Sequence, residues 1–382
     1  MNSKERVRAA IARRPVDRVP LGFYVVDHDT IERVIGRPTY VRNKPATQIA
    51  LWEGRRDEVA ESLKVDTVEF YRRIDCADIL LPKEARLLPP RDYTPDPPRK
   101  TAENIWEDRQ GRVYRAIPEA NDIMCVHDPT LGRKTYTVDD FSEPAEITPP
   151  DPSVFEVIDH VIEALGSERY IASPSGGLTA LTLLGGTENG LMMYLEAPEV
   201  LHAANRHSVA IQNARDAWYI RPGTDGVLME QDMAGTNGPL ISPDMFRTFC
   251  LPYMRERVRK VKTRTDQVIF HNCGNNLPLM EMFIEAGIDC YQSLQTTAGM
   301  DVALLKEHYG DRLCFWGGVP VELLIDGTTD DVRQAVRQAM DAGAPGGGFI
   351  LGPSHSVAAT TKYDNFMAMI DEYDTLKDRY PG

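Results

Sequence analysis

The sequence predicts an α/β fold, a (β/α)8 barrel, and three observations lead to this expectation. From residue 151 onward, six apolar, strand-like runs alternate with amphipathic segments of helical length, a pattern typical of a parallel sheet. Two further strand-like runs, at residues 18–26 (RVPLGFYVV) and 65–71 (VDTVEFY), bring the number of strands to eight. The length of 382 residues suits one such barrel with an insertion. An open, doubly wound sheet is the alternative.

The elements nearest the N-terminus are predicted from periodicity and from proline. Residues 3–13 have an amphipathic pattern that Pro15 ends, so we expect a short helix there. The strand over residues 18–26 follows and ends in polar residues. Residues 46–64 are expected to form a helix that leads into the second strand.

Residues 75–150 interrupt the alternation of strands and helices. They contain a proline-rich stretch at residues 87–100 (LLPPRDYTPDPPRK), followed by residues 104–117 (NIWEDRQGRVYRAI). In the second stretch a Gln-Gly turn separates two β-prone runs, which indicates a hairpin. We therefore expect a single domain over residues 1–382, with residues 75–150 as an insertion that covers the mouth of the barrel.

The six strands after residue 151 are short apolar runs that each end in polar or glycine residues. They are YIASPSGG (170–177), DGVLMEQD (225–232), QVIFHNCG (267–274), DCYQSL (289–294), LCFWGG (313–318) and GGFILGPSHS (347–356). In (β/α)8 barrels the active site lies at the carboxyl ends of the strands. These polar ends are therefore expected to meet at one mouth.

The residues at these strand ends supply the candidates for a site. We expect Asp232, Glu230 and Gln295 to be catalytic, and Ser175, Gln292 and Asp27 to bind substrate. Asp232 should direct its carboxylate into the pocket, as a hydrogen-bond acceptor or as a support for a metal ligand. The ordinary alternative for serines at such positions is the capping of the following helix.

Composition excludes several classes of protein. A formal net charge of -14 argues against a nucleic-acid-binding protein, because recognition of phosphates needs clustered Lys and Arg. Six scattered cysteines indicate reduced thiols rather than a disulfide framework. The charged N-terminal residues lack the apolar segment of a signal peptide, and no stretch of 18 apolar residues follows. We expect a cytoplasmic protein that does not bind membranes.

A histidine and a cysteine one residue apart, His271 and Cys273, directly follow an apolar run. Neutral imidazole and thiolate together suit Zn²⁺, and a third protein ligand would leave the fourth position open for substrate. His355, at the end of the last strand, is the candidate for that third ligand. The alternative is a polar histidine and a buried thiol without a metal.

Several blocks of the chain resemble the uroporphyrinogen decarboxylase-like superfamily of (β/α)8 barrels, and the resemblance covers most of the chain. These blocks are RAAIARRPVDRVP (8–20), QDMAGTNGPLISPDMFRTFCLPYMRERV (231–258), FHNCGNN (270–276), FWGGVP (315–320) and GGFILGPSHSV (347–357). The block from residue 232 to residue 258 is the most specific of them.

Two features place the chain closer to one branch of this superfamily. True uroporphyrinogen decarboxylases carry an Arg-Gln-Ala-Gly-Arg run after the first strand, whereas this chain has LGFYVVDHDT at residues 21–30, which disfavours a tetrapyrrole polycarboxylate. Corrinoid-linked (methylcobamide) methyltransferases have a His-x-Cys-Gly motif, which is similar to His271, Cys273 and Gly274. Their distal cysteine is replaced here by His355.

The resemblance therefore implies a zinc-assisted methyltransferase. It would move a methyl group between a small molecule, such as a thiol or a folate, and the cobalamin of a separate corrinoid protein. The alternative is a metal-free decarboxylase or related lyase, in which Asp232 stabilises a cationic intermediate and His355 handles protons. A non-catalytic barrel is the third reading. A homodimer is expected only from the prevalence of two-fold assemblies.

Overall fold

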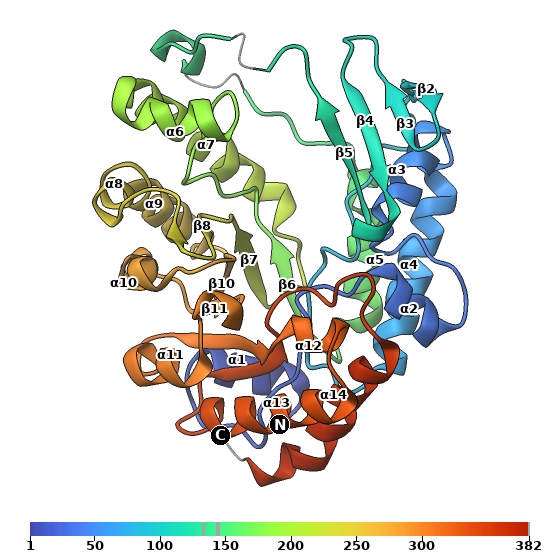
Figure 1. Cartoon of the computed structure of the whole chain (residues 1–382), viewed down its shortest axis with the longest axis vertical. Helices are drawn as coiled ribbons and strands as arrows, with labels where there is room; N and C mark the ends of the chain where they lie inside the picture. The colour runs from blue at the N-terminus through green and yellow to red at the C-terminus, as the bar shows by residue number, and fades with distance from the viewer. Residues whose placement is uncertain (132–133, 143–145, 381–382) are drawn as a thin grey trace.

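A curved, parallel sheet of seven strands forms the centre of the computed structural model, which describes residues 1–131, 134–142 and 146–380 (Figure 1). The order of the strands is β1-β6-β7-β10-β11-β12-β13. Their bounds are β1 Ile79–Leu80, β6 Tyr170–Pro174, β7 Gly226–Glu230, β10 Val268–His271, β11 Cys290–Gln292, β12 Cys314–Val319 and β13 Phe349–Pro353. The six strands predicted after residue 151 are confirmed, and the α/β fold with them.

The two outer strands of this sheet are bridged by the N-terminal segment. Leu21 pairs with Leu351 of β13, and Gly22 pairs with Ile79 of β1, both in parallel orientation. The amide of Gly22 donates to the carbonyl of Leu351 at 2.9 Å. A Cβ atom at Gly22 would lie 2.0 Å from the Ile79 side chain, so only glycine allows this approach. The strand predicted over residues 18–26 is thus reduced to isolated bridges.

The strand predicted at residues 65–71 is wrong, because these residues belong to helix α4 (Arg56–Arg73). Its β-branched and aromatic residues favour a strand by composition, but the buried positions recur at helical spacing. They include Val59, Leu63, Thr67 and Phe70. The second strand is instead β1, which lies inside the segment predicted as an insertion. The predicted helix at 46–64 is divided between α3 (Lys44–Trp52) and α4.

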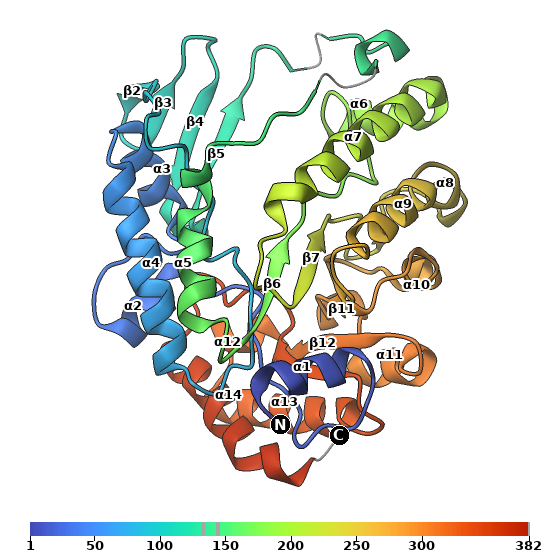
Figure 2. The same ribbon diagram turned by 180° about the vertical axis from the view of Figure 1, so that it is seen from behind.

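Helices cover the outer side of the sheet, with α7, α9, α10 and α11 on one flank and α2, α4 and α5 on the other (Figures 1 and 2). The helix predicted near the N-terminus is α1 (Ser3–Ile11), whose first turn is capped by Asn2. The remaining bounds are α2 His28–Ile35, α5 Glu156–Leu165, α6 Thr187–Glu196, α7 Pro198–Tyr219, α8 Pro243–Phe249, α9 Leu251–Val261, α10 Met280–Ala286, α11 Val302–Tyr309, α12 Val321–Ile325, α13 Thr329–Gly343 and α14 Tyr363–Leu376.

A second, antiparallel sheet of four strands is inserted after β1 and lies at the end of the molecule opposite both termini (Figure 2). Its strands are β2 Arg99–Ala102, β3 Ile105–Glu107, β4 Val113–Ile117 and β5 Asp122–His127. The predicted hairpin is confirmed as β3 and β4, with Trp106 opposite Tyr114. Trp106 is buried against Trp52 of α3, with 5.6 Å between ring centroids. Residues 132–133 and 143–145 of the predicted insertion lie outside the described residues.

A fully buried ion pair joins α7, α9 and the loop after β6. Arg257 donates to both carboxylate oxygens of Asp216, at 2.7 and 3.0 Å, and both side chains have 0% exposure. Asp216 also accepts the amide of Gly176 at 2.8 Å, and Arg257 donates to the carbonyl of Gly177. The polar groups of the pair are therefore well satisfied, as burial of two charges requires.

All six cysteines are free, in agreement with the expectation of reduced thiols. Within the described part of the chain, no helix has both the length and the apolar character needed to span a bilayer.

Candidate metal centre

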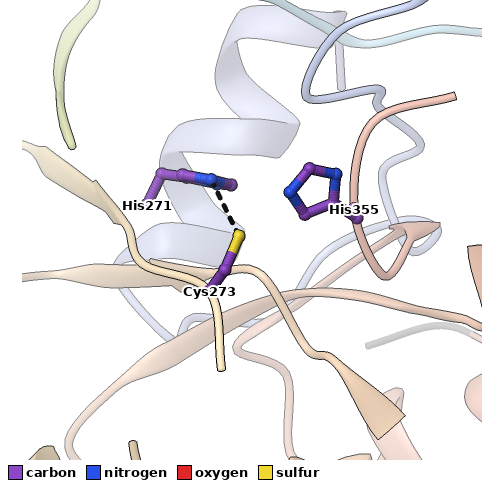
Figure 3. A group of neighbouring side chains, drawn as sticks. All are labelled: His271, Cys273 and His355. Atoms are coloured by element: carbon purple, nitrogen blue, oxygen red, sulfur yellow. Dashed lines mark hydrogen bonds between the residues drawn. The ribbon is translucent and has the colours of Figure 1, made fainter. Parts of the chain in front are cut away.

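His271, Cys273 and His355 lie together at the carboxyl ends of β10 and β13, where Figure 3 shows the three side chains facing one another. His271 Nε2 lies 3.3 Å from Cys273 Sγ, and one donor atom from each residue lies within 4.8 Å of the others. Zinc bonds of about 2.0 Å to nitrogen and about 2.3 Å to sulfur place tetrahedral donors about 3.5 Å apart. Small side-chain rotations would therefore bring all three into one coordination sphere, and the donor set fits Zn²⁺.

The backbone around Cys273 is fixed on both sides. The amide of Cys273 donates to Asp232 Oδ1 at 2.9 Å, and its carbonyl accepts from the buried side chain of Asn276 at 2.7 Å. Gly274 has a φ of +83°, and a Cβ atom there would lie 2.4 Å from the carbonyl oxygen of Ala234. Glycine is thus required for the turn that separates Cys273 from the following chain.

Gly274→Ala is expected to lower the free energy of unfolding by about 2–3 kcal/mol, because it forces an alanine into a left-handed conformation against a backbone oxygen. Denaturant titration would measure the change. Gly235→Ala is the matched control, since no atom lies within 4 Å of the Cβ position at Gly235. Equal stability of the two variants would contradict the packing described for this turn.

Gln292 determines which ring nitrogen of His271 faces the site. It lies opposite His271 on the neighbouring strand β11, it is fully buried, and its amide oxygen accepts a hydrogen bond from His271 Nδ1. The proton therefore sits on Nδ1, and the lone pair of Nε2 points toward Cys273. Gln292 was predicted to bind substrate, but the structure places it behind His271 as a support.

Burial controls the protonation of all three candidate ligands. It lowers the pKa of His271 to about 4, with a further lowering from His355, and it also lowers the pKa of His355. Both imidazoles are therefore neutral at pH 7, as metal ligation requires. Burial, together with the negative charge of Asp232, raises the pKa of Cys273 to about 12. Without a metal the thiol thus keeps its proton.

Tyr24 covers one face of His271. The two rings are stacked with 3.8 Å between centroids and an interplanar angle of 1°. Lys83 donates to the Tyr24 hydroxyl at 2.6 Å, and both Lys83 and the Tyr24 hydroxyl contact the carboxylate of Glu230. Burial raises the pKa of Glu230, but the contacts with Lys83 and Tyr24 lower it, and the pKa lies below its usual value. This carboxylate is therefore ionised and paired at neutral pH.

Tyr24 and Lys83 were missed by the sequence reasoning. Tyr24 lies within the strand predicted over residues 18–26 and was given no role in the site, whereas its ring lies against His271. Lys83 lies in the loop that follows β1, so the rule that sites gather at strand ends could have identified it. The misassigned strand at residues 65–71 concealed that signal.

Apart from Cys273 and Gln292, which are described above, the predicted site residues divide into two groups. A cavity of about 470 Å³ at the metal centre is lined by Glu230, Asp232, His271 and His355. The other three predicted residues contact backbone amides instead. Asp27 accepts from Ala359 at 3.1 Å, Ser175 from Gly177 at 3.1 Å and Gln295 from Gly274 at 3.0 Å. These three hold the loops around the site and do not line this cavity.

Two curated relatives match a limited part of the chain. Methylcobamide:CoM methyltransferase MtbA of Methanosarcina acetivorans is 21% identical over 132 residues, which cover 35% of this chain and 37% of the relative. A uroporphyrinogen decarboxylase of Chlorobium phaeobacteroides is 26% identical over 145 residues, which cover 37% of this chain and 38% of the relative. The chain thus spans somewhat more than a third of the length of either relative.

A solved structure and a family model extend the likeness to most of the chain. The structure of a methyltransferase from Methanosarcina mazei superposes with a TM-score of 0.61 at 17% identity, covering 98% of this chain and 99% of that one. This similarity concerns the fold. The family model described as uroporphyrinogen decarboxylase (URO-D) matches residues 125–376. The chain belongs to the uroporphyrinogen decarboxylase (URO-D) family.

Proposed function

We propose that the protein is a zinc-assisted methyltransferase that moves a methyl group between a small molecule and the corrinoid of a partner protein. One observation carries the proposal, namely the convergence of His271, Cys273 and His355 with their donor atoms within 4.8 Å. A thiol at this position has no evident use in metal-free acid-base chemistry, whereas it is a strong ligand for zinc.

The residues of the chain prepare this site before any ion binds. Gln292 presents the free nitrogen of His271, and Asp232 fixes the backbone of Cys273. Zinc bound by these ligands would supply Lewis acidity and would hold an incoming thiol in its reactive, deprotonated form. Lys83 lines the same cavity and is paired there with Glu230.

We further propose that the sheet is a closed (β/α)8 barrel within one domain over residues 1–382, with the segment around Leu21 as the eighth strand. The bridges from this segment to β1 and β13 support the closure. We propose also that residues 75–150 form a cover over the mouth. In support of this, Asp122 and Ile123 of β5 line a second cavity of about 320 Å³. That cavity shares Lys83 with the cavity at the metal centre.

The experiment is a transfer assay with the zinc-loaded protein. Methylcobalamin serves as donor, and the acceptors are a panel of thiols that includes CoM, the acceptor in the name of the Methanosarcina acetivorans relative. We expect zinc-dependent loss of the methyl–cobalt absorbance together with formation of a methylated thiol, measured by mass spectrometry.

The match to a uroporphyrinogen decarboxylase supports the second candidate, a metal-free decarboxylase or lyase that uses Asp232 and His355. Release of carbon dioxide from a small carboxylate by protein stripped of zinc, without methyl transfer to any acceptor, would establish this candidate and contradict the methyltransferase.

A further inference from the structure

Two neighbouring cavities beside the candidate metal centre are lined by the same basic side chains. The cavity at His271 and the neighbouring cavity of about 320 Å³ have Arg42, Lys44 and Lys83 in common. The second cavity adds a fourth cation, Arg86. In a chain with a net charge of -14, four cations around one cavity are a marked local departure from the average.

Three of these four cations are neutralised by neighbouring carboxylates. The pairs are Arg42 with Asp27 at 3.0 Å, Lys44 with Asp122 at 3.1 Å, and Lys83 with Glu230. Arg86 differs from them, since within residues 1–131, 134–142 and 146–380 its side chain has no hydrogen bond or ion pair to the protein.

The remaining carboxyl group in this cavity wall does not neutralise Arg86. Glu84 is buried, and its Oε1 accepts the amide of Val26 at 2.9 Å. Burial raises the pKa of Glu84 to about 8, so the group is mostly protonated at pH 7. The cavity therefore carries one uncompensated guanidinium that remains accessible to solvent.

We propose that Arg86 binds an oxyanionic group of the substrate, a carboxylate, sulfonate or phosphate, while the reacting end of the same molecule lies at His271, Cys273 and His355. A planar guanidinium matches such an oxyanion through two parallel hydrogen bonds. One free guanidinium in a cavity of about 320 Å³ fits a small molecule with one anionic group, rather than a polycarboxylate. Only the position of the reacting end rests on the proposed function.

The anion site is tested first without the metal chemistry. Full-length protein carrying Cys273→Ser is titrated calorimetrically with propionate, propanesulfonate and propyl phosphate, and with neutral propanol as the comparison. We expect binding of at least one anion but not of propanol, and the three anions distinguish the sources of the oxyanion. Arg86→Gln should weaken that binding about tenfold or more, because it removes a charge-assisted pair of hydrogen bonds. Arg115→Gln, which removes an exposed arginine of β4 that lines neither cavity, should leave the binding unchanged.

The link between the two sites is tested with mercaptocarboxylates of increasing chain length and with 2-mercaptoethanol, on the zinc-loaded protein. Affinity should reach a maximum at the length that spans the metal centre and Arg86, and this maximum should disappear in Arg86→Gln. Anion binding that survives Arg86→Gln would overturn the inference. Anion binding that depends on Arg86, without any thiol binding to the zinc-loaded protein, would support the inference and contradict the proposed function.

Discussion

Cys273→Ser is expected to lower the affinity of the protein for Zn²⁺ by at least about a hundredfold. Loss of a group that merely supports a ligand costs 10- to 100-fold in metal affinity, and loss of a thiolate ligand should exceed that range. Competition with a chromophoric chelator would measure the dissociation constants. Cys125→Ser is the control, because Cys125 is an exposed thiol on β5, outside the candidate centre. Equal affinities of the two variants would exclude Cys273 as a ligand.

Binding of zinc to the protein with Cys273 intact should release about one proton per zinc ion at pH 7. The pKa of the Cys273 thiol is raised to about 12, so the thiol enters the reaction protonated, whereas His271, with a pKa of about 4, is already neutral. Zinc affinity should therefore rise with pH through the neutral range. Calorimetry in buffers of different ionisation enthalpy counts the protons, and in Cys273→Ser the released proton should disappear.

Asp216→Ala is expected to lower the free energy of unfolding by about 3–5 kcal/mol, because it leaves the fully buried guanidinium of Arg257 without its counter-charge. Denaturant unfolding followed by circular dichroism measures this. Asp216→Leu combined with Arg257→Met should restore much of the stability, since the double variant buries no charge. Glu281→Ala, which breaks the exposed bidentate pair with Arg312, should change stability little. Equal effects of the two alanine variants would contradict the energetic role of the buried pair.

Most of the sheet could be predicted because buried parallel strands are recognisable as short apolar runs. Strands such as β10 and β13 are buried throughout, and each ends where the chain turns polar. His271 and Cys273 could be recognised as a candidate metal centre because both residues directly follow one of these short apolar runs.

The rest of the site depends on contacts between distant segments. Gln292 supports His271 because the two residues face each other across neighbouring strands, a register that the sequence does not reveal. Tyr24 and Lys83 come from loops, where the direction of a side chain follows from tertiary packing. At residues 65–71, β-branched composition favoured a strand, but packing on α5 and α2 selected a helix.

The bridges from Leu21 and Gly22 also determine the order in which the molecule can be completed as it is made. This segment is synthesised long before one of its partners, Leu351 of β13, which lies much later in the sequence. Until then β1 and the growing edge of the sheet present unpaired amides and carbonyls, which can pair with other nascent chains. Bringing residues so far apart in sequence into contact also makes this a late and slow step. The short segment that joins the two outer strands therefore cannot complete its pairing until β13 has been synthesised.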